Sequence, residues 1–175
     1  IVVSITIDPA AALGARDIVV TTSNGVATLE DAFEVLAPEP TISGVSPLSG
    51  IQGETLDVPI TGTDLNDPEA VSFGEGISVN YYSTDNATQM VVNITIDAAA
   101  ATGARDITIT TAGGTATSES GFAVGSAPPT ITGASPASGM QGQTLDVTVS
   151  GTYLTDPSGV SFGDGITVNS YTTGD

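Results

Sequence analysis

The side chains that carry most enzymatic chemistry are scarce in this chain. It has no His, no Cys and no Lys, and its basic residues are Arg16 and Arg105. A histidine base, a thiol nucleophile and a reactive amine are therefore all missing. The 20 Asp and Glu residues leave open only a pair of carboxylates acting as acid and base. We therefore expect a protein without catalytic activity.

One loop crowds four oxygen-bearing side chains together, at Asp64, Asn66, Asp67 and Glu69. Because Ca²⁺ takes about 6 to 8 oxygen ligands, this loop is the candidate metal site of the chain. A solvated acidic loop explains the same residues, and the number of oxygens that Ca²⁺ requires favours that interpretation. No other cofactor is expected.

The two arginines occupy equivalent settings, because each is followed by an aspartate, Asp17 or Asp106. A guanidinium group can bind a carboxylate through two parallel hydrogen bonds. We expect each arginine to pair with a carboxylate on a neighbouring strand. An arginine that clamps a ligand is the alternative, although nothing else nearby in the sequence suggests a ligand site.

Tyrosines and asparagines offer two kinds of contact with sugars. Tyrosine rings could stack on a sugar, but side chains half-buried at sheet edges are the simpler explanation. The four tyrosines are Tyr81, Tyr82, Tyr153 and Tyr171. Asn86 and Asn93 each begin an Asn-X-Thr triplet, which is the acceptor pattern for N-glycosylation. We expect Asn86 in a loop and Asn93 within a strand, so Asn86 is the better acceptor.

These residues must be positioned by a repeated fold. Residues 40–62, PTISGVSPLSGIQGETLDVPITG, return at 129–151 as PTITGASPASGMQGQTLDVTVSG, an offset of 89 residues. Compared over 1–86 and 90–175, this offset gives 51 identities in 86 pairs without insertion or deletion. A unit of this length can bury a small core of its own, so we expect independent domains in a row.

The pattern within a repeat predicts strands. Apolar residues alternate with small or polar ones at 1–7 and again at 90–96, which is the period of a half-buried strand. The segments 8–14 and 97–103 begin with Asp and end with Gly, which predicts one short helical turn in each. Residues 16–35 predict a hairpin closed by a primed turn at Asn24-Gly25. Pro59 predicts an edge strand or a position facing solvent.

Counting these segments gives about seven strands per 89-residue repeat, which is typical of an immunoglobulin-like β-sandwich. In the central repeat the residues expected to point inward are Leu56, Val58, Phe73, Val92, Ile94, Ile107, Ile109 and Phe122.

The domain boundaries are expected at two short segments, 36–40 and 125–129. Each contains two prolines, and the two copies are poorly similar there. Residues 1–37 are the C-terminal half of a repeat, 38–126 a complete repeat, and 127–175 the N-terminal half of one. A half repeat has too few strands to bury a core. We therefore expect 127–175 to be completed by residues 1–37 of a neighbouring chain, or by continuation of a longer polypeptide.

Several motifs carry a family resemblance. They are Pro-Thr-Ile, Ser-Pro, Ser-Gly, Thr-Leu-Asp-Val, Gly-Thr, Val-Ser-Phe-Gly, and Asp-Ile-Thr-Ile-Thr-Thr followed by Gly-Gly and Phe. With them the chain resembles the IPT/TIG family of immunoglobulin-like domains over essentially its whole length. The resemblance implies a seven-stranded sandwich, used as a spacer or interaction module in microbial surface proteins, receptor ectodomains and transcription factors, and beside sugar-active enzymes. Such motifs specify a fold more than an activity.

The charge narrows the choice of partner. The formal net charge of −18 repels phosphate backbones and anionic lipids, so neither nucleic acid nor a membrane surface is an expected partner. No apolar run approaches the ~20 residues that span a bilayer, and no signal peptide is visible. The absence of Cys is compatible with an extracellular or cell-surface protein of a microbe.

Together these observations predict a structural module of an extracellular microbial surface protein, stalk or fibre that assembles head to tail. The expected partners are copies of itself, with surface glycans or other surface proteins as further partners. An adhesin or carbohydrate-binding module is the alternative. An accessory domain of a secreted enzyme is a second alternative.

Overall fold

In a computed structural model, residues 1–173 are described, and all of their regular secondary structure is β-strand. The all-β fold class is therefore confirmed. The chain divides into two compact units, residues 1–125 and 126–175. The expected boundary after residue 37 lies inside the first unit and stays a prediction. Within residues 1–173, no helix is long and apolar enough to cross a membrane.

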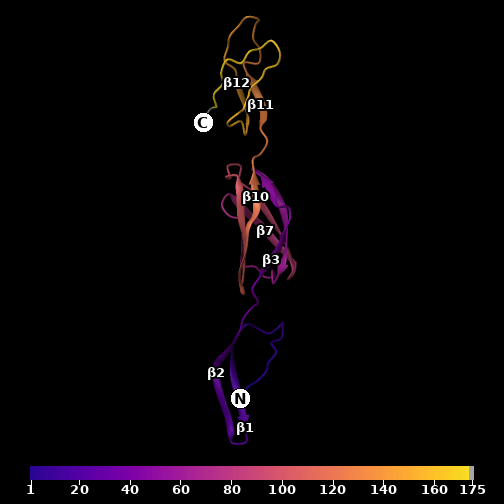
Figure 1. The fold of residues 1–175 in the computed structure, drawn as a ribbon, viewed down its shortest axis with the longest axis vertical. Coiled ribbons are helices and arrows are strands. Elements are labelled where there is room, and N and C mark those ends of the chain that lie inside the picture. Colours follow the sequence, from indigo (N-terminus) through magenta and orange to yellow (C-terminus); the bar gives the residue numbers. More distant parts are fainter. Residues whose placement is uncertain (174–175) are drawn as a thin grey trace. The chain divides into compact units, whose positions relative to one another are not determined.

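Residues 41–125 form a sandwich of two four-stranded sheets (Figure 1). One sheet has the antiparallel order β3 (Thr41–Val45), β5 (Thr55–Thr63), β8 (Gln89–Ile96) and β7 (Ile77–Asn86). The other has the order β4 (Ser49–Ile51), β10 (Gly114–Gly125), β9 (Gly103–Thr111) and β6 (Ala70–Ser72). Only β4 runs parallel to its neighbour, β10. This is the expected immunoglobulin-like architecture.

The sandwich has eight strands where about seven were expected. β3 pairs with β5 in one sheet, and the chain then passes through Ser46 and Pro47 to β4, which pairs with β10 in the other sheet. One stretch of sequence thus supplies an edge strand to both sheets. Turn signals in the sequence do not reveal such a crossing.

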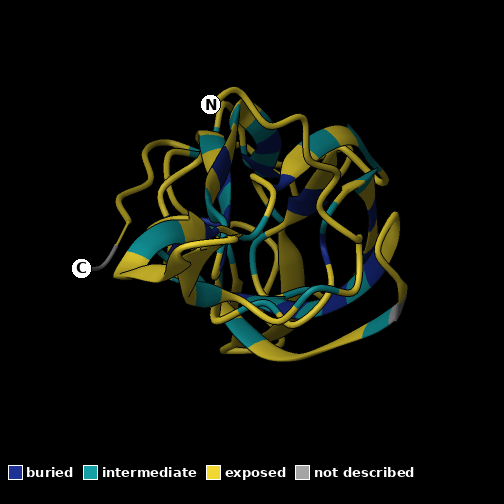
Figure 2. Cartoon of the chain, turned by 90° about the horizontal axis from the view of Figure 1, so that it is seen from below, coloured by how far each residue is buried: buried dark blue, intermediate teal, exposed yellow. Residues whose placement is uncertain are grey.

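The core lies between the two sheets, and Figure 2 shows buried segments on the strands. Phe73 and Phe122 meet edge to face, with their ring centroids 5.5 Å apart. Seven of the eight residues expected to point inward are buried, and Leu56 is partly buried against them. The two-residue period therefore predicted the register of the complete repeat correctly.

Pro59 lies in an inner strand, because β5 has β3 on one side and β8 on the other. Its side chain is exposed, and its carbonyl oxygen accepts a hydrogen bond from the backbone N–H of Ser46 at 3.0 Å. Since the nitrogen and oxygen of one residue point to the same side of a strand, the proline nitrogen faces the place where β3 ends. The backbone N–H that proline lacks is therefore not needed at this position of the sheet. The solvent-facing alternative is therefore confirmed, and the edge alternative is wrong.

The first unit also contains the hairpin of β1 (Gly14–Thr22) and β2 (Gly25–Val35), which pair as expected. The strand expected at residues 1–7 is wrong, because no strand forms there. Its counterpart in the complete repeat, β8, is hydrogen-bonded to β5 on one side and β7 on the other. Both of these strands belong to the N-terminal half of a repeat. Residues 1–7 lack such neighbours, and an alternating pattern does not form a strand without them.

The second unit shows the converse. β11 (Thr130–Ser135) and β12 (Thr148–Thr152) pair with each other, whereas the counterparts of β6 and β7, at 159–161 and 166–173, form no strand. In the complete repeat β6 pairs with β9, and β7 pairs with β8. Those partner strands lie in the C-terminal half of a repeat, so the pairing is again incomplete.

Two local expectations are wrong. The hairpin loops are Ser23-Asn24 and Ala112-Gly113, so Gly25, with φ of 140°, follows the loop instead of forming its second residue. A primed turn requires positive φ within the loop, and neither Ser23 nor Asn24 has it, so the turn is not a primed one. Residues 8–14 and 97–103 form no helical turn but a single hydrogen-bonded reversal, as between the N–H of Ala100 and the carbonyl of Asp97 at 3.0 Å. A helix nucleus is costly in a segment this short.

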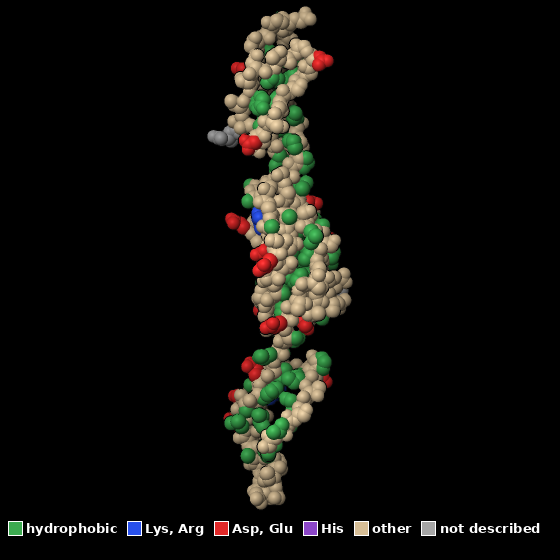
Figure 3. All heavy atoms as spheres, in the orientation of Figure 1, with side chains coloured by type: hydrophobic (Ala, Val, Ile, Leu, Met, Phe, Trp, Pro, Cys, Tyr) green, Lys and Arg blue, Asp and Glu red, His purple; other side chains and the backbone are tan. Residues whose placement is uncertain are grey.

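The acidic side chains are spread over the visible surface (Figure 3). Repulsion among 20 carboxylates with two compensating arginines destabilises the compact state at very low ionic strength. We expect the thermal midpoint Tm to rise when salt is added from the low millimolar range to moderate concentration. Calorimetry in a neutral salt measures this change. A Tm that stays flat over that range would show that self-repulsion has no effect on stability.

Candidate functional site

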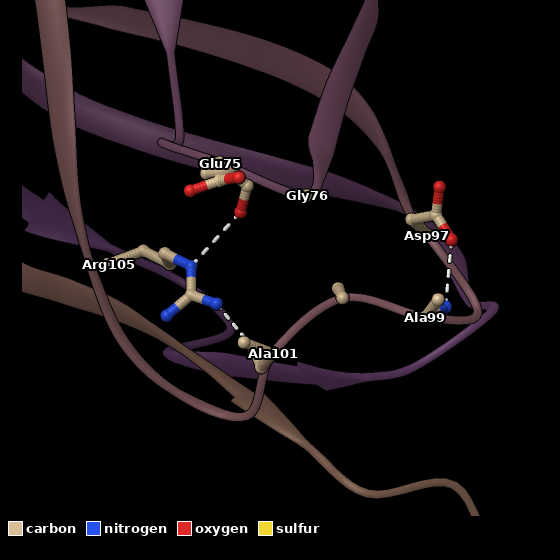
Figure 4. Close-up of a pocket in the computed structure, with 7 residues that line it drawn as sticks. Glu75, Gly76, Asp97, Ala99, Ala101 and Arg105 are labelled. Atoms are coloured by element: carbon tan, nitrogen blue, oxygen red, sulfur yellow. Dashed lines mark hydrogen bonds between the residues drawn. The ribbon is translucent and has the colours of Figure 1, made fainter.

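A hollow of about 630 Å³ lies beside the start of β9 (Figure 4). The loop between β6 and β7 contributes Glu75 and Gly76, and the loop between β8 and β9 contributes Asp97 and residues 99–101. Arg105, on β9, completes the lining. The two sheets therefore meet at this hollow, and its shape depends on how the two loops are held.

Arg105 ties the two loops together. Its Nε donates a hydrogen bond to the carbonyl of Glu75 at 3.1 Å, and its terminal nitrogens donate to the carbonyls of Ala104, at 2.9 Å, and Ala101. The expected pairing of this arginine with a carboxylate is wrong. The planar guanidinium has five N–H donors, so it can bind several backbone carbonyls at once. The neighbouring Asp106 instead accepts from the backbone N–H of Ser120, at 2.7 Å.

Asp97 holds the other side of the hollow. Its Oδ1 accepts from the backbone N–H of Ala99 at 2.7 Å, and its own N–H donates to the carbonyl of Gly76 at 2.9 Å. Ala100 is buried beneath this turn, and the side chain of Gln52 donates to its carbonyl at 2.7 Å. Each loop is thus fixed by hydrogen bonds to a different strand or loop, which gives the hollow defined walls.

The polar groups around the hollow are two carboxylates and one guanidinium, together with backbone carbonyls. Such groups can exchange hydrogen bonds with the hydroxyls of a ligand. No imidazole, thiol or amine side chain exists in the chain to act as a nucleophile. The arrangement therefore suits reversible binding better than covalent chemistry.

The acidic loop of the calcium candidate, Asp64, Asn66, Asp67 and Glu69, follows β5. Asp64 and Asp67 adopt left-handed φ angles of 53° and 50°, and Leu65 is buried between them. The Nδ2 of Asn66 donates to Oδ2 of Asp67 at 3.5 Å. In the described part of the chain, no three His, Cys, Asp or Glu side chains gather in a group that could hold a metal ion. Calcium binding stays a prediction.

The two glycosylation candidates differ in the freedom of the amide nitrogen. Asn86 is exposed at the end of β7, and its Oδ1 accepts from the backbone N–H of Thr88 at 2.8 Å. Asn93 lies within β8, and its Nδ2 donates to Oδ1 of Asp57 at 2.6 Å. Glycosylation joins the sugar to Nδ2, and in Asn93 that atom is already bonded across the sheet.

Expression in a host that glycosylates secreted proteins is therefore expected to modify Asn86 and to leave Asn93 unmodified. Intact-mass spectrometry should show one glycan mass that disappears in Asn86→Gln and persists in Asn93→Gln. A glycan that persists in Asn86→Gln would mean that Asn93 remains accessible to the transferase despite its place in the sheet.

Two of the four tyrosines lie on an edge strand. Tyr81 and Tyr82 are exposed on β7, the edge strand of its sheet. The hydroxyl of Tyr82 donates to the carbonyl of Pro68 at 3.0 Å, and Tyr171 repeats this contact with Pro157 at 3.3 Å. The edge position of Tyr81 and Tyr82 agrees with expectation, although Tyr81 is 58% exposed and not half-buried. The matching hydroxyl contacts show that the two copies fold alike locally.

Sequence reasoning missed the hollow beside Arg105. The available signal was an arginine at the same place in both copies, next to an alanine-rich segment at 98–101. The atoms that bind the guanidinium are backbone carbonyls, which every residue possesses. No pattern of side chains could therefore identify them, and the sequence pointed to carboxylates instead.

Comparisons with known proteins give one family match and one similar solved structure. Residues 39–120 match the family model for quinohemoprotein amine dehydrogenase, alpha subunit domain III, over less than half of the chain. A search of curated proteins gives no significant match. Among solved structures, the chain is similar to SGBP-B from a complex xyloglucan utilization locus in Bacteroides uniformis, with 26% identity and a TM-score of 0.36. That alignment covers 66% of this chain, which spans 31% of the other protein.

The resemblance to immunoglobulin-like domains is thus confirmed at the level of the sandwich fold. The family model that matches residues 39–120 is the amine dehydrogenase domain, and no IPT/TIG model matches. The IPT/TIG assignment therefore remains a proposal.

Proposed function

We propose that this chain is a structural repeat module of an extracellular microbial surface protein, stalk or fibre, of the IPT/TIG type. The observation that carries the proposal is the arrangement of one complete sandwich between two segments that are counterparts of its own halves. The copies share 51 of 86 compared residues, which supports the same sandwich in each complete repeat. A tandem array of this kind sets length and spacing.

The side-chain inventory supports a role without catalysis. The chain lacks His, Cys and Lys, and the polar groups that it does bring together bind its own backbone. This function requires no cofactor. The acidic surface favours solubility outside the cell and opposes contact with nucleic acids and anionic lipids.

The partner in this proposal is a further copy of the chain, joined head to tail. Light scattering over rising protein concentration tests it at moderate salt, where charge repulsion is screened. The mass is expected to grow from one chain of 17.3 kDa to multiples of it, and electron micrographs should show filaments. A mass that stays at one chain across the whole range would overturn the proposal.

Denaturing electrophoresis of the native material separates two versions of the proposal. A band near 17.3 kDa indicates separate subunits. A much larger band indicates one polypeptide in which this chain is a stretch two repeats long. In both versions the same repeat surfaces meet.

The hollow beside Arg105 favours a second function, that of an adhesin or carbohydrate-binding module. Its carboxylates, guanidinium and carbonyls suit the hydroxyls of a sugar. A glycan array probed at concentrations where the chain is a monomer tests this function, with Glu75→Gln expected to weaken binding and Asp164→Asn, its counterpart in the incomplete copy, expected to leave it unchanged. If the chain binds no glycan on the array, the second function is rejected. No observation favours an accessory domain of a secreted enzyme.

A further inference from the structure

We infer that the outer face of the sheet formed by β3, β5, β8 and β7 binds a neutral glycan, with the ring of Tyr81 at the centre of the site. The inference rests on the second proposed function, carbohydrate binding, and deepens it, because it names a further surface and the class of sugar that fits. The site belongs to the complete repeat. None of the residues that form it lines the hollow beside Arg105.

A bulge in β7 prepares this face. Val79 lies opposite Ile94 of β8, and the next pair along the strands is Tyr81 with Asn93. Asn80 is therefore an extra residue in β7, and a bulge of this kind can re-aim a side chain. Because Ile94 is buried, its neighbour Asn93 points outward, and Nδ2 of Asn80 donates to Oδ1 of Asn93 at 2.8 Å. The bulge thus places the side chain of Asn80 on the outer face beside Tyr81.

The side chain of Tyr81 lies across the sheet. Its hydroxyl donates to Oδ1 of Asp57, on β5, at 3.5 Å. β8 lies between β5 and β7, and neighbouring strands are about 4.8 Å apart, so the ring must extend over β8 to reach this carboxylate. Tyr81 is nevertheless 58% exposed. One face of the ring is therefore turned toward the sheet, and the other face is open to solvent.

Hydrogen bonds hold polar groups in place around the ring. Nδ2 of Asn93 donates to Oδ1 of Asp57 at 2.6 Å. Nδ2 of Asn80 also donates to the hydroxyl of Thr95 at 2.9 Å, and that hydroxyl is 2.9 Å from the hydroxyl of Thr55. Within the described chain, both hydrogen bonds that Asp57 accepts go to Oδ1. Its Oδ2 is therefore available to a hydroxyl of the ligand, and the groups around it are already ordered.

The outer face extends beyond the ring as a flat strip. Pro59 is exposed on β5, and opposite it Val91 of β8 is partly buried. This apolar pair lies two residues along the strands from the pair of Asp57 and Asn93. The outward positions of β5 run from Thr55 to Thr63, which at about 3.3 Å per residue gives roughly 26 Å. Such a strip accommodates an extended chain of several sugar residues.

A pyranose sugar has the chemistry that these groups recognise. The C–H groups on one side of its ring pack on an open aromatic face, and the hydroxyls at its edge exchange hydrogen bonds with carboxylates and amides. The net charge of −18 repels acidic sugars, which favours a neutral glycan. The incomplete copy has Ser170 at the position of Tyr81, so this ring is a feature of the complete repeat.

Affinity electrophoresis of the whole chain tests the site, because an acidic protein migrates readily in a native gel and is slowed when it binds a polysaccharide in the gel. The neutral probes are hydroxyethylcellulose and galactomannan, and the anionic probe is polygalacturonate. We expect a neutral probe to slow the unaltered chain and the anionic probe to leave it unaffected. Tyr81→Ala should weaken binding by roughly tenfold, whereas Tyr81→Phe, which keeps the ring, should weaken it by no more than about twofold.

Tyr82→Ala is the matched control, because it removes the next ring on the same strand. Tyr82 lies opposite the buried Val92, and its hydroxyl donates to the carbonyl of Pro68, so it lies on the other side of β7. This variant should bind as the unaltered chain does. Thermal unfolding of each variant shows whether the fold is kept. An equal loss of binding in Tyr81→Ala and Tyr82→Ala would overturn the assignment to the outer face.

The results distinguish the inference from the function on which it rests. Binding that survives Tyr81→Ala overturns the inference, and if that binding is lost in Glu75→Gln, carbohydrate binding at the hollow remains. Slowing by polygalacturonate alone overturns the choice of a neutral glycan. If no polysaccharide slows the unaltered chain, the inference and the carbohydrate-binding function are both overturned.

Discussion

Replacing Phe73 by alanine is expected to lower the free energy of unfolding of the complete repeat by about 3 to 5 kcal/mol. The ring is 1% exposed and meets Phe122 edge to face, with an angle of 86° between the ring planes. Its removal would take away both the buried apolar area and the aromatic contact, and would leave a cavity between the sheets. Denaturant unfolding followed by far-UV circular dichroism measures the change.

The matched control is Phe162→Ala, which makes the same change at the counterpart position in the incomplete copy. That ring is 41% exposed, so at concentrations where the chain is a monomer its loss should cost about 1 kcal/mol or less. Equal losses in the two variants would contradict the burial of Phe73.

The core of the complete repeat could be predicted because apolar residues recur at every second position of its strands. On β8, Val92, Ile94 and Ile96 are buried, and Asn93 and Thr95 lie between them. A shift of one residue would turn every apolar side chain toward solvent, so the pattern and the register determine each other. The same logic located the inner faces of β5 and β9.

The same pattern failed at residues 1–7, although it is nearly identical to that of β8. A strand needs neighbours on its hydrogen-bonding edges, and residues 1–7 pair with no other strand in the described structure. Periodicity predicts which side chains lie on each face of a strand, but it does not predict which strands pair with its two edges. The number of strands was also predicted wrongly, as about seven where the structure has eight. The chain changes its pairing partner between β3 and β4, from β5 in one sheet to β10 in the other, and periodicity does not show such a change.

The candidate site could be predicted least well. Arg105 and Asp97 were visible as residues, but their partners are the backbone groups of Glu75, Ala101 and Gly76. Backbone partners depend on how loops from different strands approach one another. Tertiary structure alone supplies that information, which is why a side-chain pairing was expected in place of a carbonyl clamp.

Gly62→Ala is expected to destabilise the complete repeat, because the added methyl group would clash with backbone. A Cβ at this position would lie 1.8 Å from the carbonyl oxygen of Thr41 and 2.8 Å from its carbonyl carbon. Gly62 pairs with Ile42 beside the irregularity between β3 and β5, where the two strands approach closely. Gly151 repeats the approach against Thr130, also at 1.8 Å, so the close contact belongs to the repeat.

Neither backbone can move without breaking the pairing of β3 with β5, because Gly62 also donates its N–H to the carbonyl of Thr88 at 3.0 Å. Overpacking of a well-packed site costs about 1 to 3 kcal/mol, and a clash with backbone belongs at or above the upper end of that range. Gly125→Ala is the control, since its Cβ would meet only ordinary contacts at 3.6 Å or more, and it should change stability by no more than about 0.5 kcal/mol. Urea unfolding of both variants decides the matter, and coincident midpoints would show that β3 can retreat from Gly62 at no cost.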